Sequence, residues 1–64
     1  MSFKPVFIMP DGERASNAQR FETRAEAIAS ARARFMRWTM PADYDAEQSG
    51  DPINYKYQDG DIAI

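Results

Sequence analysis

The sequence predicts an α+β fold in which one central α-helix packs on a small antiparallel β-sheet. Two observations lead to this prediction. Only one long stretch, Phe21 to Pro41, carries strong helical signals. The segments before and after it are short, rich in alternating polar and apolar residues, and separated by turn-forming residues. The expected order is strand, strand, helix, strand, strand and a final short strand. One helix on one face of an antiparallel sheet is the layered arrangement that this order favours.

The chain is expected to form a single domain over residues 1–64. A domain of this size buries only about 60% of the surface of its unfolded chain, so its stability is marginal and dimerisation has a physical motive. Hydrophobic residues make up 44% of the sequence, which is typical of a folded domain and not of a disordered segment.

The N-terminal segment is predicted to form a β-hairpin. Phe3–Met9 is rich in β-branched and aromatic residues, which favour strands. Because proline cannot donate a ladder hydrogen bond, Pro5 places this strand at an edge of the sheet, or places the start of its pairing at Val6. Pro10-Asp11-Gly12 is a strong turn signal. A short second strand is expected over Glu13–Ser16.

The start of the helix is predicted by a capping box. Thr23 is followed three residues later by Glu26, so each side chain can bond the backbone N–H of the other residue. Five alanines, the residue with the highest helix propensity, follow in the next stretch. Pro41 lacks an N–H and restricts the residue before it, so the helix is expected to end near Trp38 to Met40.

The helix is expected to be amphipathic. Its period of 3.6 residues places an apolar stripe on one side, formed by Ala27, Ile28, Ala31, Phe35 and Trp38. The opposite side carries Glu26, Ser30, Ala33 and Arg37. Small residues at the start of the stripe let the helix lie close to a sheet, and the two aromatic residues at its end are predicted to close the core.

Two or three strands are predicted after the helix. Asp43–Gln48 alternates, with Tyr44 and Ala46 inward and the acidic residues outward. Ile53–Gln58 is the most regular strand and places Ile53, Tyr55 and Tyr57 on one face. Asp59-Gly60 is a hairpin signal, and Asp61–Ile64 is expected to form the last short strand.

Charge is unevenly distributed along the chain, whose net charge is −2. Residues 1–40 carry seven basic and four acidic side chains, whereas residues 41–64 carry one basic and six acidic side chains. A basic helix beside an acidic last third indicates either internal ion pairs or two surfaces of opposite sign.

The residue types weigh against most catalytic chemistry. The chain has no Cys and no His, so it lacks disulfides, the usual zinc ligands and the usual base for a serine nucleophile. Asp43, Asp45 and Glu47 share one face of a strand and could bind a divalent ion, but the segment from Asp43 to Asn54 lacks the EF-hand spacing. We therefore predict a protein that is not an enzyme and has no cofactor or metal.

Several residues together resemble a known group of sequences. These are Arg20-Phe21-x-Thr23-Arg24-x-Glu26-Ala27, then Phe35-x-Arg37-Trp38-Thr39-x-Pro41, then Tyr44, Glu47 and Asp51-Pro52-x-Asn54-Tyr55. The pattern resembles small uncharacterised open reading frames of bacteriophages and bacterial genomes, over roughly residues 20–55. The resemblance implies no catalytic residues. It implies that the chain acts as very small phage proteins often do, by binding a host protein.

The leading hypothesis is a phage-like accessory protein that binds, and inhibits or redirects, a host protein in the bacterial cytoplasm. The predicted contact residues are the helix arginines and the acidic strand: Arg32, Arg34, Arg37, Asp43, Asp45 and Glu47. Two plainer interpretations stay open. Arginine stems can cover apolar surface while their heads reach water or a strand carboxylate. Acidic side chains can protect a strand edge and keep the protein in solution.

The alternative function is a small nucleic-acid-binding module that uses the arginine-rich helix, with Tyr55 or Tyr57 stacking on bases. The sequence pI of about 4.9 weighs against it, because such binding draws most of its affinity from positive charge. A homodimer and a structural subunit of a phage particle are further expectations. No membrane partner is expected, since no stretch approaches the roughly 20 apolar residues that span a bilayer, and no signal peptide is recognisable.

Overall fold

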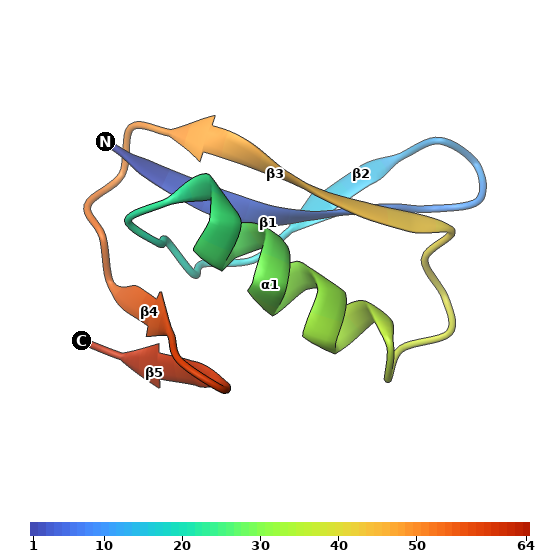
Figure 1. Cartoon of the computed structure of the whole chain (residues 1–64). Coiled ribbons are helices and arrows are strands. Elements are labelled where there is room, and N and C mark those ends of the chain that lie inside the picture. The colour runs from blue at the N-terminus through green and yellow to red at the C-terminus, as the bar shows by residue number, and fades with distance from the viewer.

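The computed structural model describes residues 1–64 and contains one helix and two antiparallel sheets (Figure 1). The first sheet has the strand order β2-β1-β3, and the second is a hairpin of β4 and β5. The element bounds are β1 (Ser2–Ile8), β2 (Arg14–Ser16), α1 (Arg24–Phe35), β3 (Asp43–Ser49), β4 (Tyr55–Tyr57) and β5 (Asp61–Ala63). The α+β class, the element order and the helix packed on a sheet are confirmed. The strands form two separate sheets, however, where the sequence indicated one.

Strand β1 is the central strand of the larger sheet, so the prediction that Pro5 marks an edge is wrong, whereas the alternative that pairing begins at Val6 holds on the β2 side only. Pro5 is buried and lies opposite Ala46 of β3. Its missing N–H points to the other side, where β2 stops. There Phe3 exchanges two backbone hydrogen bonds of 2.8 Å with Phe21, and β2 pairs only from Val6 onward. The Ser16 hydroxyl donates to the Pro5 carbonyl over 2.6 Å. Proline is tolerated at this position because no residue of β2 lies opposite it to accept a hydrogen bond from an N–H.

The core lies between α1 and the inner face of the three-stranded sheet (Figure 1). Phe21 is fully buried there and packs with Ala27 and Ala46. Near the other end of the helix, the Phe35 ring lies 5.1 Å from that of Tyr44. The inward placement of Tyr44 and Ala46 is therefore confirmed.

The helix begins as predicted and ends earlier. Thr23 is the N-cap, and its hydroxyl accepts from the Glu26 N–H over 3.2 Å. The last helical residue is Phe35, where the sequence indicated Trp38 to Met40. The Arg34 carbonyl accepts from the Trp38 N–H four residues later and also from the Arg37 N–H three residues later, so the chain leaves the helix through a tighter last turn. The Trp38 ring then meets Phe7 edge-on at a centroid distance of 5.4 Å.

The polar side of α1 is partly covered by the β4–β5 hairpin. Ser30 is buried and Glu26 is half-buried, although both fall opposite the apolar stripe. One Glu26 oxygen accepts from the Tyr57 backbone N–H over 3.2 Å, and the other accepts from the Thr23 hydroxyl over 3.2 Å. Only half of the capping box therefore forms, because the Glu26 carboxylate is used to attach the hairpin instead of bonding the Thr23 N–H.

A set of hydrogen bonds fastens the segment before β4 to the segment before α1. Asn54 Oδ1 accepts from the Arg20 backbone N–H over 2.7 Å, and Asn54 Nδ2 donates to the Ala18 carbonyl over 3.0 Å. Arg20 Nε in turn donates to Asp51 over 2.9 Å. This Arg20 hydrogen bond, followed by one from the Ser49 hydroxyl, lowers the pKa of Asp51 below its ordinary value of 3.8. We call Arg20, Asp51 and Asn54 the clip.

None of the helical structure is both long and apolar enough to cross a membrane.

Candidate protein-binding surface

The three predicted arginines lie together around the C-terminal end of α1. Arg34 reaches a strand carboxylate, since its guanidinium lies 3.6 Å from Asp61 of β5. Arg37 Nε donates to the Ala33 carbonyl of its own helix over 3.4 Å. Arg32 forms no salt bridge, and it lines a hollow on the exposed side of the helix. The structure thus brings this half of the predicted site together, but the three guanidinium groups have different surroundings.

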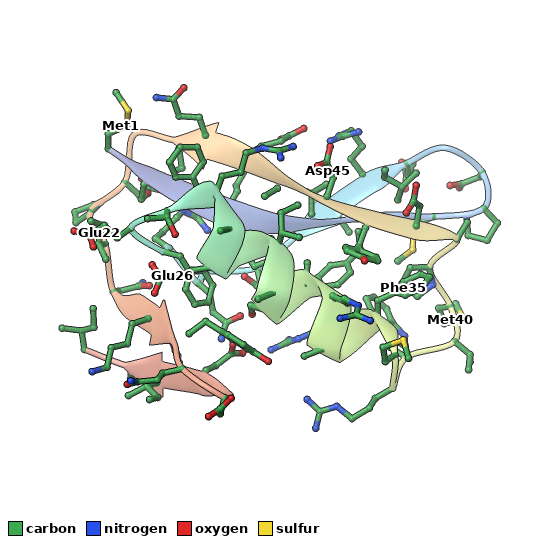
Figure 2. All side chains as sticks on the ribbon, viewed as in Figure 1. Met1, Glu22, Glu26, Phe35, Met40 and Asp45 are labelled. Carbon is green, nitrogen blue, oxygen red and sulfur yellow. The ribbon has the colours of Figure 1, made fainter.

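The predicted acidic residues lie elsewhere, on strand β3. Asp43, Asp45 and Glu47 lie opposite Ile8, Val6 and Lys4 of β1 and alternate along β3 with the inward-facing Tyr44 and Ala46. They therefore lie on the sheet face that is turned away from α1, where Figure 2 labels Asp45. Their outward placement is as expected. The arginine and acidic sets therefore belong to different faces of the molecule, and they do not form one continuous site.

The acidic residues are also largely engaged within the chain. Arg14 of β2 lies 2.7 Å from Glu47 and 3.7 Å from Asp45. Arg24 lies 2.8 Å from the other oxygen of Asp45. Arg14 has to cross β1 to reach these carboxylates, and Val6 of β1 is buried on that face. The long polar side chains thus shield apolar surface as well as pairing their charges.

A shallow hollow of about 410 Å³ lies on the exposed side of α1, where Tyr57 of β4 approaches the helix. Its lining residues are Ala29, Arg32, Ala33, Met36 and Tyr57. A smaller hollow of about 210 Å³ adjoins it and shares Ala33 and Tyr57 with it. The lining of the smaller hollow is polar, with Ser30, Arg34, Arg37, Asp59, Gly60 and Asp61 completing it.

Met36 is the residue that sequence reasoning missed at this site. Its side chain is 72% exposed, although it is large and apolar. The available signal was its position four residues after Arg32, which places both side chains on the same side of a helix. We call Arg32, Met36 and Arg37, with the hollow beside them, the arginine–methionine surface.

The two arginines of this surface differ from the other arginines of the chain because they have no carboxylate nearby. Arg14, Arg20, Arg24 and Arg34 each lie within 4.0 Å of a carboxylate, whereas Arg32 and Arg37 do not. Arginine and methionine are both enriched in protein interfaces. The surface can therefore bind an apolar group and, beside it, one or two carboxylates or phosphates.

The structure brings together no group of three or more His, Cys, Asp or Glu side chains that could hold a metal ion.

Comparison of the chain with known proteins gave no match to a protein-family model, a curated protein or a solved structure.

Proposed function

We propose that the protein acts by binding another protein through the arginine–methionine surface. The observation that carries the proposal is the exposed Met36, which lines the larger hollow with Arg32, while Arg37 lines the adjoining one. Neither arginine lies within 4.0 Å of a carboxylate. An exposed methionine leaves apolar surface in water, and a partner that buried this surface would gain binding free energy. The unpaired guanidinium groups provide directed hydrogen bonds at the rim of the same contact.

The partner that fits this surface presents an apolar side chain flanked by carboxylates. The apolar side chain would enter the larger hollow against Met36 and Tyr57. The carboxylates would meet Arg32 at that hollow and Arg37 at the adjoining one. Arginine binds a carboxylate through two parallel N–H groups, which adds geometric specificity to the charge attraction. The acidic row on β3 lies on the other sheet face and has no part in this contact.

The proposal extends to the biological setting. Its support is the resemblance of residues 20–55 to small phage and bacterial open reading frames and the lack of His and Cys for catalysis. We therefore propose a non-enzymatic, phage-like accessory protein that binds a host protein in the bacterial cytoplasm and inhibits or redirects it.

The test is affinity capture from bacterial lysate with the tagged protein and two variants of equal charge change. Arg32→Glu reverses a charge on the proposed surface, whereas Lys56→Glu reverses one on β4, outside the lining of either hollow. We expect one dominant host protein to be captured by the wild type and by Lys56→Glu, and to be lost with Arg32→Glu. Capture of the same protein by all three chains would contradict the proposed surface.

A nucleic-acid-binding module is the second candidate, and one observation favours it. Arg32 and the partly exposed Tyr57 line the same hollow, which is the combination of cation and ring that binds single strands. Asp59 and Asp61 in the adjoining hollow oppose it, because they repel phosphates. Titration of binding against salt separates the candidates. Phosphate contacts give an affinity that falls log-linearly with salt concentration, whereas an apolar interface does not.

A further inference from the structure

Strand β5 has an open edge that the rest of the fold does not cover. The outer edge of its neighbour β4 is occupied, because the Tyr55 N–H donates to the Arg20 carbonyl over 3.0 Å and the Tyr57 N–H donates to Glu26. β5 is the last strand of a two-stranded sheet and pairs only with β4. A two-stranded sheet is marginally stable in water, and further strands stabilise it.

The pairing of β5 fixes which of its backbone groups face the open side. The Ile64 N–H donates to the Asn54 carbonyl over 3.0 Å, and Ile62 lies opposite Lys56. In an antiparallel pair, alternate residues bond the same neighbour. The N–H and C=O groups of Asp61 and Ala63 therefore point away from β4, toward the open edge.

The side chains at this edge do not protect it. Ile62 is 39% exposed and Ile64 is 78% exposed. Native edge strands usually carry charges, prolines or bulges that prevent pairing with another chain. Strand β3 follows this rule, with Asp43, Asp45 and Glu47 along its length. A second copy placed against β3 would meet this row of charged side chains. Strand β5 carries only one charged side chain, Asp61, which is already engaged by Gln19 and Arg34 of the same chain.

We propose that two copies of the chain pair through β5 to form a continuous four-stranded sheet in the order β4-β5-β5-β4. A two-fold axis through Ile62 places Asp61 of each copy opposite Ala63 of the other. Each such pair exchanges two backbone hydrogen bonds, and Ile62 of one copy packs against Ile62 of the other. The interface is self-complementary, as a two-fold dimer requires.

The test is sedimentation equilibrium over a concentration series up to about 1 mM, which reaches the weak associations typical of interfaces below about 1,200 Å². We expect the mass to rise from 7.3 kDa toward twice that value. Ile62→Lys places two cations opposite each other and should abolish the rise. The matched control is Ile53→Lys, because Ile53 is 38% exposed and lies outside β5, so this variant should still dimerise.

A second variant tests the backbone pairing directly. Ala63→Pro deletes an N–H that faces the open edge and leaves the bonds to β4 in place, so it should also give a monomer with an intact hairpin. Hydrogen exchange of the wild type requires no variant. The amides of Asp61 and Ala63 should become protected as the concentration rises, whereas those of Arg14 and Ser16 on the β2 edge should not.

Two results would overturn the proposal. One is a wild-type mass that stays at 7.3 kDa with no concentration-dependent protection in β5. The other is a dimer that persists in both Ile62→Lys and Ala63→Pro. The inference is independent of the proposed function, since Arg32→Glu should remove binding to a host protein and leave the β5 dimer unchanged.

Discussion

Replacing Asn54 by alanine should destabilise the fold more than a change at an exposed position usually does, although Asn54 is exposed. Its side chain accepts from the Arg20 N–H over 2.7 Å and donates to the Ala18 carbonyl over 3.0 Å. Alanine removes both bonds. At about 0.5–1.5 kcal/mol for each bond, Asn54→Ala should lower the free energy of unfolding by about 2 kcal/mol.

That loss is large for a domain of 64 residues. A chain of this length is expected to have a free energy of unfolding of roughly 3–10 kcal/mol, and about 2 kcal/mol should lower its melting temperature by roughly 8–16 °C. Urea denaturation followed by Trp38 fluorescence measures the change. Asn54→Asp keeps the acceptor and loses the donor, so it should fall between wild type and Asn54→Ala.

The matched control for this prediction is Gln58→Ala. Gln58 is also an exposed amide near the hairpin, and its side chain forms no hydrogen bond. Its replacement should change the free energy of unfolding by less than about 0.5 kcal/mol, as is usual at the surface. Equal, small effects of Asn54→Ala and Gln58→Ala would show that the clip does not hold the segment before β4 to the segment before α1.

Four further variants test the packing and the charges. Phe21→Ala should lower the free energy of unfolding by about 3–5 kcal/mol in urea denaturation, since Phe21 is fully buried, and an unchanged melting temperature would contradict its place in the core. Thr23→Ala should lower the free energy of unfolding by about 1 kcal/mol because the helix loses its N-cap. Glu26→Ala should speed hydrogen exchange at the Tyr57 amide, whose hydrogen bond is to the Glu26 carboxylate. The lowered pKa of Asp51 means that its carboxylate stabilises the folded state above pH 3.8, and that this contribution is lost as the pH falls below 3.8. Asp51→Asn should therefore weaken the protein at neutral pH and give a shallower loss of stability in acid; an unchanged acid profile would refute the role of Asp51.

The features that the sequence predicts well are those decided by neighbours along the chain. The Thr23 cap depends on residues within one helical turn. The turn at Gly12 and the hairpin at Asp59-Gly60 need positive φ angles, and these residues have φ values of 91°, 58° and 147°. Glycine adopts such angles without strain, and aspartate tolerates the left-handed region better than most residues.

The features that the sequence does not predict depend on contacts between distant segments. Nothing near Pro5 indicates that β2 ends beside it and leaves its missing N–H without a partner to bond. The neighbouring Phe3 pairs instead with Phe21, which lies in another part of the chain. The polar side of α1 could not be assigned correctly either. Ser30 becomes buried because a hairpin 25 or more residues later in the chain packs beside it.

The same distinction applies to the candidate site. The clustering of Arg32, Arg34 and Arg37 follows from helical spacing and was predictable. The pairing of Arg34 with Asp61, and of Arg14 with Glu47, requires the tertiary fold. The separation of the arginine and acidic sets onto different faces therefore could not be obtained from composition or from charge along the chain.

The residues that carry the resemblance are largely explained by the fold. Arg20, Asp51 and Asn54 form the clip, Phe21 fills the core, and Thr23 caps the helix. Their spacing along the sequence reflects contacts between the segment before α1 and the segment before β4. Mutational searches for a partner should therefore begin with Arg32 and Met36 and avoid the clip, where a loss of binding would report unfolding.

The central position of β1 also determines when the protein can fold during synthesis. β1 is made first, but its long partner β3 ends at Ser49, and the clip closes only with Asn54. The helix can form early as a local structure, yet it has no complete sheet to pack on until that point. Phe7 and Phe21 thus leave the ribosome long before they can be buried, and this interval is when a chaperone or a second nascent chain has access to them.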